Sequence, residues 1–427
     1  MLQFLDLRGV AADLSGRLPR PDLGADGPVA EVRAIVAEVR SRGDEAVREY
    51  TRRFDDVDLG ELRVPPDEVH AACRRVEPEL LAALSAARES VETFHRHRPA
   101  AMAAVDRNGI HIEALELPVA RAGAYVPGGR ARYPSGVLMT CVPAKVAGVG
   151  AVALCVPPSA GGRLPDAVLA AASLAGVDEV YRIGGPQAIA ALAYGTASIP
   201  PVDVIVGAGS RWVSLAKEQV RGVVGVPAAF AGPSEVVVVA DDTVPADFAA
   251  IDLIVQAEHG PDGLAWLLTW SERALEQVTA AVSRLVAEAP RRAEIESTLS
   301  GGGYGVLVDG PEQALAVSNE IAPEHLELCC ENPESLLPLV RNAGAVFLGP
   351  LSPASFGDYI AGPSHVLPTF GSARFASVLG VDDFLRRVHV VRASQEAIEK
   401  LGRHVETMAT SEGLAAHAQS ISLRRRT

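Results

Sequence analysis

The sequence predicts an α/β fold built on parallel sheets, and three observations support this prediction. Short apolar runs of strand length alternate with short helical segments between residues 150 and 220. A second alternating series extends from residue 235 to residue 348. Glycine or proline follows several of the apolar runs, where a strand must turn into a helix. Such alternation is typical of a parallel sheet that helices cover on both faces.

The first 100 residues are predicted to be helical. Within 28–53 and 79–95, apolar residues recur at helical spacing and charged residues occupy the other face. This part of the sequence contains no nucleotide-binding motif. The pattern changes near residue 110, so we expect the sheet region to follow it.

The first alternating series is bounded by proline and glycine. Pro165 opens one helix, and Gly195 follows the end of another. The predicted strands are 150–156, 179–183 and 202–206, and the predicted helices are 165–175, 188–194 and 210–220.

The second series has a helix over 246–258 that must end near Gly260 and Pro261. Its predicted strands are 235–240, 264–270, 305–308 and 345–348. The end of the chain, 381–427, is predicted to be mostly helical.

Composition limits the class of protein. A length of 427 residues suggests two or more domains, and a net charge of −14 disfavours a nucleic-acid partner. Five cysteines without a C-x-x-C spacing indicate a reducing compartment rather than a disulfide framework. Residues 1–8 lack a signal-peptide pattern, and Pro143 and Lys145 interrupt the most apolar stretch. We therefore expect a cytoplasmic protein with no membrane partner.

Three glycine-rich turns fall at predicted strand ends, where parallel-sheet proteins bind their ligands. They are 123–129, which contains Tyr125, then 184–187, which contains Gln187, and 207–210, which contains Ser210. Free amides at the start of a helix could face a phosphate. None of the three matches G-x-G-x-x-G, so ordinary turns and a dinucleotide site both remain open interpretations.

Gln256 and His259 are three residues apart at the end of an apolar helix, so they share one helix face. They could bind a metal, or His259 could simply cap the helix. Zinc needs about four ligands, so this pair alone does not define a site.

Glu324 and His325 are adjacent at the start of a predicted helix or turn. A histidine of ordinary pKa, about 6.5, is suited to accepting a proton at neutral pH. The alternative is a helix first-turn charge beside a partly buried imidazole.

A glycine-rich loop over 357–365 carries Asp358 and His365, and a short helix near the chain end carries Glu412 and His417. Turn formation and a solvated helix surface explain these residues equally well. Taken together, the nitrogen and oxygen donors of these segments suit zinc better than calcium. No cysteine lies among them, so a thiolate nucleophile is not indicated.

These segments carry a family resemblance. The chain resembles the histidinol dehydrogenase family along nearly its whole length, from Leu5 to the helix at 412–414. The matching motifs are Tyr125-Val126-Pro127-Gly128-Gly129, Ala231-Gly232-Pro233-Ser234-Glu235, Gln256-Ala257-Glu258-His259-Gly260-Pro261-Asp262, Ala322-Pro323-Glu324-His325-Leu326, Gly357-Asp358-Tyr359 and His365-Val366-Leu367-Pro368-Thr369.

The resemblance implies a role for each matching position. The implied catalytic pair is Glu324 and His325, and the implied zinc ligands, one ion per subunit, are Gln256, His259, Asp358 and His417. The implied substrate-binding residues are Ser234, His365 and Glu412 together with His325 and the four zinc ligands. The implied NAD contacts are Tyr125, Gln187 and Ser210.

The resemblance also implies two Rossmann-like parallel-sheet domains, one inserted in the other, with small helical N- and C-terminal segments. The expected domains are 1–15, then 16–124 with 236–379 for zinc and catalysis, 125–235 for NAD, and 380–427 as a dimerisation tail. The family forms a homodimer in which this tail reaches the partner's active site.

The implied reaction is the zinc-dependent, NAD-linked four-electron oxidation of L-histidinol to L-histidine through histidinal. The sequence departs from the family pattern at Ser210, at Ala228 and at Pro363-Ser364. These departures leave open a related enzyme that oxidises another alcohol, such as a sulfonated diol. A non-catalytic metal-binding scaffold is a second alternative, which the presence of both Glu324 and His325 disfavours.

Overall fold

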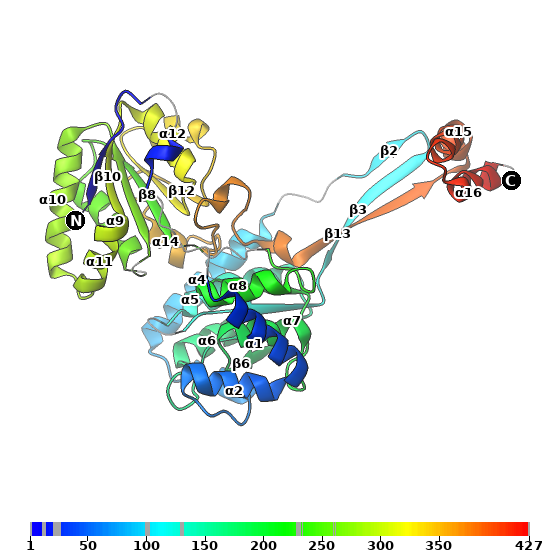
Figure 1. Cartoon of the computed structure of the whole chain (residues 1–427), viewed down its shortest axis with the longest axis horizontal. Coiled ribbons are helices and arrows are strands. Elements are labelled where there is room, and N and C mark those ends of the chain that lie inside the picture. The colour runs from blue at the N-terminus through cyan, green and yellow to red at the C-terminus, as the bar shows by residue number, and fades with distance from the viewer. Residues whose placement is uncertain are drawn as a thin grey trace. The chain divides into compact units, whose positions relative to one another are not determined.

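The computed structural model describes residues 2–10, 14–19, 27–98, 103–128, 132–227, 232, 234–258, 260 and 262–425. The chain forms two compact units (Figure 1). The first unit contains Met1–Arg96 and Ala120–Asp383, and the second contains His97–Val119 and Phe384–Thr427. In the part of the chain that is described, no helix has the length and apolar character needed to cross a membrane.

The larger sheet of the first unit has six parallel strands in the order β1-β10-β9-β8-β11-β12. They are β1 (Gln3–Asp6), β8 (Glu235–Ala240), β9 (Leu264–Thr269), β10 (Gly303–Leu307), β11 (His325–Cys329) and β12 (Ala345–Leu348). The residues of β8, β9, β10 and β11 are all buried, which explains why these strands are nearly continuous apolar runs.

Helices cover both faces of this sheet. Val236 and Val238 of β8 pack with α9 (Ala246–Ala257), α10 (Glu272–Glu288) and α11 (Arg292–Gly302). Val237 and Val239 share the opposite core with α12 (Pro311–Ile321) and α13 (Pro333–Leu336). Because successive strand residues point to opposite faces, this alternation confirms the predicted double covering.

The smaller sheet has four parallel strands in the order β6-β5-β4-β7. They are β4 (Arg121–Tyr125), β5 (Ala151–Cys155), β6 (Glu179–Tyr181) and β7 (Val204–Val206). The helices between them are α5 (Pro134–Val146), α6 (Asp166–Leu174), α7 (Gly185–Tyr194) and α8 (Arg211–Val220). The predicted α/β class is confirmed.

The N-terminal helices join the core of the smaller sheet. Val32 and Tyr50 belong to the same apolar cluster as Ile189 and Leu192 of α7. The helices are α1 (Val29–Arg42), α2 (Asp44–Asp55), α3 (Pro66–Ala72) and α4 (Pro78–Arg96). Residues 97–119, which the sequence assigned to the first domain, group instead with the C-terminal segment.

The second unit contains strands that the sequence analysis missed. β3 (Ile110–Pro118) pairs antiparallel with β13 (Leu385–Ala393) and with β2 (Val105–Arg107), and α15 (Gln395–Ser411) packs on α16 (Ala415–Arg425) (Figure 1). The prediction that 381–427 is mostly helical is confirmed by α15 and α16, but it did not include β13. No residue of β13 is fully buried, so this strand lacks the apolar run of a core strand.

The remaining short elements connect the larger ones. They are η1 (Ser15–Arg17), η2 (Leu337–Leu339), α14 (Ala354–Tyr359), η3 (Ser372–Arg374) and η4 (Val381–Phe384).

Candidate active site

Glu324 and His325 lie at the amino end of β11, next to the amino end of β8. Helix α12 ends at Ile321, and Ala322 adopts a left-handed conformation with a φ of 53°. The chain then enters β11 directly, with His325 opposite Val236 in the register. The predicted helix or turn over 322–326 was wrong, because the left-handed residue reverses the chain into a strand.

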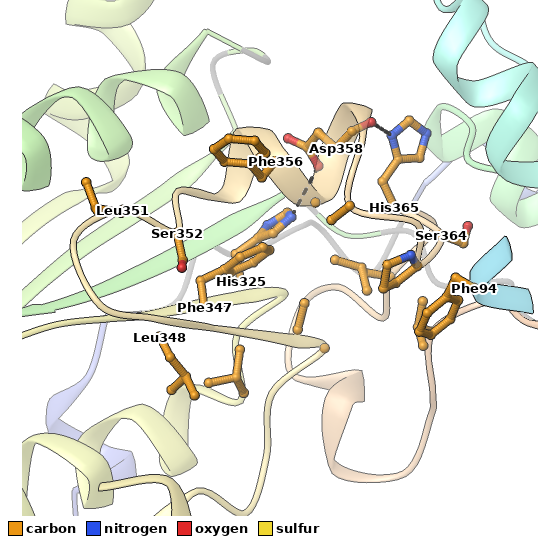
Figure 2. A pocket seen from close by; sticks show the side chains of 18 residues that line it. Phe94, His325, Phe347, Leu348, Leu351, Ser352, Phe356, Asp358, Ser364 and His365 are labelled. Carbon is orange, nitrogen blue, oxygen red and sulfur yellow. Dashed lines mark hydrogen bonds and ion pairs between the residues drawn. The ribbon is translucent and has the colours of Figure 1, made fainter. Parts of the chain in front are cut away.

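His325 lies between two carboxylates. Its Nδ1 atom is 3.9 Å from Oε2 of Glu324. Its Nε2 atom is 3.5 Å from Oδ1 of Asp358, a contact that is dashed in Figure 2. The same Glu324 oxygen accepts the backbone N–H of Glu235 at 3.2 Å. Only 6% of His325 and 7% of Glu324 is exposed, so these charges interact with little screening by water.

The surroundings of His325 change its proton affinity. Burial has the largest effect and by itself lowers the pKa of His325. The charge of Glu324 and the hydrogen bond and charge of Asp358 act in the opposite direction and raise the pKa above its ordinary value. An imidazole held in this way gains a proton readily, which is the property that a general base needs.

Asp358 belongs to the short helix α14, where the sequence predicted a glycine-rich loop. That prediction was wrong because one turn of helix forms in spite of Gly357. The backbone carbonyl of Asp358 accepts a hydrogen bond from Nδ1 of His365 at 2.9 Å (Figure 2). With Nδ1 as the donor, Nε2 is the acceptor nitrogen of a neutral His365 ring.

These side chains line a cavity of about 660 Å³, a size suited to a small molecule. Aromatic rings of Phe94, Phe347 and Phe356 form part of its apolar wall, as Figure 2 shows. The ring of Phe347 stacks against His325 with centroids 6.0 Å apart. The site thus combines an apolar wall with a few polar groups, as is typical of ligand pockets.

The structure describes some of the predicted zinc ligands but does not bring all four together. Gln256 is buried at the end of α9, and its Nε2 atom has no hydrogen-bond partner. His259 lies outside the described residues, and His417 belongs to the second unit. Across the ranges given above, no three His, Cys, Asp or Glu side chains form a metal-binding group. The zinc set, which includes a glutamine, stays a prediction.

The predicted NAD residues gather at one edge of the smaller sheet. Tyr125 ends β4, Gln187 lies in the first turn of α7 after β6, and Ser210 precedes α8 after β7. The Tyr125 hydroxyl accepts the N–H of Gly185 at 3.2 Å. Gln187 is fully buried, and neither polar atom of its amide has a hydrogen-bond partner. This edge therefore holds unsatisfied polar groups beside a glycine-rich turn.

The remaining predicted residues are less tightly grouped. Ser234 directly precedes β8, and its carbonyl accepts the N–H of Leu264 at 3.0 Å. Glu412 and His417 are exposed in the second unit. They do not share one short helix as predicted, because Glu412 caps α15 and His417 lies in α16.

The comparison with known proteins decides the family. The histidinol dehydrogenase family model matches residues 18–425. The chain belongs to the histidinol dehydrogenase family. A histidinol dehydrogenase of Synechococcus sp. is 47% identical over 92% of both chains. One of Thermosynechococcus vestitus is 47% identical over 99% of this chain and 98% of its own.

A solved structure agrees with this assignment. The histidinol dehydrogenase of Elizabethkingia anophelis has a TM-score of 0.95 and 35% identity, covering 100% of this chain and 98% of its own. Membership of the histidinol dehydrogenase family makes the chain an oxidoreductase that acts on a small molecule, and the predicted family was correct.

The sequence analysis missed one pair of neighbouring carboxyl groups near the site, one buried and one half-buried. Asp252 of α9 and Glu327 of β11 are hydrogen-bonded to each other through their side chains. Each is a single acidic residue within an otherwise apolar segment, Ala249–Ala257 and Leu326–Cys330 respectively. A charge inside a predicted core element was the signal that could have identified them.

Proposed function

We propose that this chain oxidises L-histidinol to L-histidine through L-histidinal, with zinc and NAD as cofactors. The observation that supports this function best is the position of His325 between Glu324 and Asp358 at the wall of a small-molecule cavity. One imidazole and two carboxylates are the groups that a pair of coupled oxidation steps requires for proton transfer.

In the first oxidation, His325 accepts the hydroxyl proton of the alcohol as the carbinol carbon becomes an aldehyde. In the second, Glu324 accepts a proton from the water that adds to the aldehyde, and the resulting hydrate is oxidised to the carboxylate. NAD, when bound, would accept one hydride in each oxidation, so two NAD molecules would be reduced for each substrate molecule. The buried position of Glu324 and His325 keeps bulk water from the reacting atoms.

The donor chemistry of the site fits a zinc ion. Gln256 offers a buried amide and Asp358 a carboxylate, and His259 and His417 would add two imidazoles. Burial, followed by the charges of Asp358, Tyr133 and Glu258, raises the pKa of Tyr359. Zinc, when bound, would supply a fixed attachment point for the nitrogens of the substrate.

The polar groups at the edge of the smaller sheet fit a dinucleotide. The amide of Gln187 has no partner although it is fully buried, and such a group costs stability unless a ligand satisfies it. Gly185 has a φ of +61°, and a Cβ there would lie 2.6 Å from Oε1 of Gln187. Tyr125, Gln187 and Ser210 would hold NAD at this edge.

A homodimer is part of this proposal. The second unit exposes large apolar side chains on both of its long strands, including Leu115, Leu117, Val388 and Val391. Apolar surface of this kind is typical of a protein interface. Glu412 and His417 would then complete the site of the partner subunit. We also propose a cytoplasmic location, which the five free cysteines support.

One departure from the family pattern concerns the loop before His365. Ser364 is buried, its hydroxyl donates to the carbonyl of Met139 at 3.0 Å, and its oxygen accepts the N–H of Val366 at 3.2 Å. The Ser364 hydroxyl therefore connects this loop to α5.

The test is NADH formation with L-histidinol and with a panel of other alcohols. We expect two NADH per histidinol consumed, loss of activity with a chelator, and recovery on adding zinc. Release of free aldehyde with one NADH, or faster turnover of another alcohol, would contradict the proposal.

A further inference from the structure

A pair of acids, of which Glu327 is buried and Asp252 is half-buried, connects three elements that carry predicted site residues. Asp252 on α9 and Glu327 on β11 share a hydrogen bond, and only 3% of Glu327 is exposed. Two ionised carboxylates cannot donate to each other, so one of the two carries a proton. Burial, followed by the nearby charge of Asp252, raises the pKa of Glu327, and burial also raises the pKa of Asp252, so the pair shares a proton at neutral pH.

Glu327 has a second partner on a third element. Its Oε1 atom accepts the backbone N–H of Ala354 at 2.9 Å. Ala354 is the first residue of α14, where backbone N–H groups have no partner within the helix. The arrangement Asp252–Glu327–Ala354, called the carboxyl bridge below, therefore joins α9, β11 and α14.

The spacing along each element relates the carboxyl bridge to the site. Residues four apart in a helix share a face, and residues two apart in a strand point to the same side of the sheet. Each member of the bridge has a predicted site residue at this spacing: Asp252 has Gln256, Glu327 has His325, and Ala354 has Asp358.

We propose that Asp252 and Glu327 are positioning residues that hold α9 and α14 against β11, and so set the separation of His325 and Asp358. This inference builds on the proposed function, because it assigns a role to groups behind the same site. Neither carboxyl group reacts. A small displacement of a reacting group can lower a rate by about 100-fold, so a rigid tie between three elements has a direct use.

A purely structural pair would behave differently when replaced. Replacing both members of a buried polar pair by apolar residues of similar volume often costs no stability, whereas removing one member leaves the other unpaired. Glu327→Leu removes both contacts of the bridge, whereas Glu327→Gln keeps them, because its amide donates to Asp252 and its oxygen accepts from Ala354. The two variants therefore separate positioning from packing.

The experiment uses the full-length protein and four variants. We expect E327L to lower kcat by about 10–100-fold and to weaken zinc binding, titrated with the metal alone, by a similar factor. E327Q should remain within about threefold of wild type in both measurements, since it keeps the geometry of both contacts. The double variant D252L/E327L should resemble E327L without leaving an unpaired carboxyl group in the core, and it serves if E327L fails to fold. C329A, on the same face of β11 but outside the bridge, is the matched control.

Hydrogen–deuterium exchange of α14 provides a readout that does not depend on the substrate. Exchange should be faster in E327L than in wild type, and unchanged in E327Q and C329A. If wild type does not oxidise histidinol but α14 exchanges faster in E327L alone, the proposed function is wrong and the positioning role of the bridge is supported. The positioning role would be contradicted if folded E327L had the same α14 exchange rate and zinc affinity as wild type. It would also be contradicted if E327L and E327Q lost activity and zinc affinity equally.

Discussion

The two sheets of the first unit present their predicted site residues at opposite ends of their strands. In the smaller sheet, Tyr125, Gln187 and Ser210 follow the carboxyl ends of β4, β6 and β7. In the larger sheet, Glu324 and His325 lie at the amino end of β11. The rule that ligands bind at the carboxyl ends of parallel strands therefore locates the predicted NAD residues but not Glu324 and His325.

The difference has an electrostatic meaning. Carboxyl ends of strands lead into helix N-termini, whose free N–H groups favour anions such as a dinucleotide phosphate. At the amino ends of β11 and its neighbours, the helices α9 and α12 end, and helix C-termini favour cations. Gln256 and Glu324 lie there, so the larger sheet suits a metal ion and proton transfer, and the smaller sheet suits a nucleotide.

The largest test of this division is His325→Asn. Loss of the imidazole should lower kcat by about 10²–10⁴-fold, because general-base assistance is lost, while zinc and NAD binding change little. Steady-state kinetics with histidinol and a zinc titration measure the effect. His70→Asn, an exposed histidine on α3, is the control. Full activity of His325→Asn would show that proton transfer does not depend on His325 of the larger sheet.

Lys217 provides a stability test within the smaller sheet. Its ammonium group donates to the carbonyl of Gly207 after β7, and only 2% of the residue is exposed. Burial lowers the pKa of Lys217 from 10.5 to about 8. Between about pH 8 and 10.5, the unfolded chain holds one more proton than the folded chain, so the free energy of unfolding rises with pH.

The rise attributable to Lys217 should approach about 3 kcal/mol, since one pKa unit is about 1.4 kcal/mol. Urea unfolding of wild type and Lys217→Met at about pH 7.5 and 10 measures it. Other groups titrate in both proteins, so the difference between their pH dependences isolates this lysine. If the free energy of unfolding changed equally with pH in the two proteins, burial would not lower the pKa of Lys217.

Gln187→Leu tests whether the unsatisfied amide at the smaller sheet serves a ligand. Removing two buried polar atoms without partners should raise the free energy of unfolding by about 1–3 kcal/mol. The same change should weaken NAD binding by about tenfold, the worth of a hydrogen bond to the cofactor. Thermal unfolding and NAD titration report the two effects separately. A less stable variant that binds NAD normally would exclude this role.

The sequence predicted the buried parts of the fold better than the exposed parts. Strands β5, β8 and β9 are continuous apolar runs because helices cover both of their faces, so their composition identifies them. Strands β3 and β13 are partly exposed along their whole length, and their pairing joins residues far apart in the chain. No local pattern records such a partner.

The site shows a similar limit. Local sequence left Glu324 and His325 as a helix start, because the left-handed Ala322 that directs them into β11 is not a glycine. The resemblance to a family supplied their role. The carboxyl bridge escaped both approaches, since the hydrogen bond between Asp252 and Glu327 depends on the packing of α9 against β11.

Ser210→Asn is the mildest test of the division between the sheets. Ser210 is the N-cap of α8, and its side chain makes no capping hydrogen bond. Serine and asparagine are about equally favourable at an N-cap, so the stability of α8 should not change. The resemblance implies an asparagine at this position in the family, and one added hydrogen bond to NAD should tighten binding by about 2–10-fold. NAD titration measures this gain, and kcat with histidinol should stay constant because the larger sheet is untouched. Unchanged affinity would place the NAD contact of this edge elsewhere, on Tyr125 and Gln187.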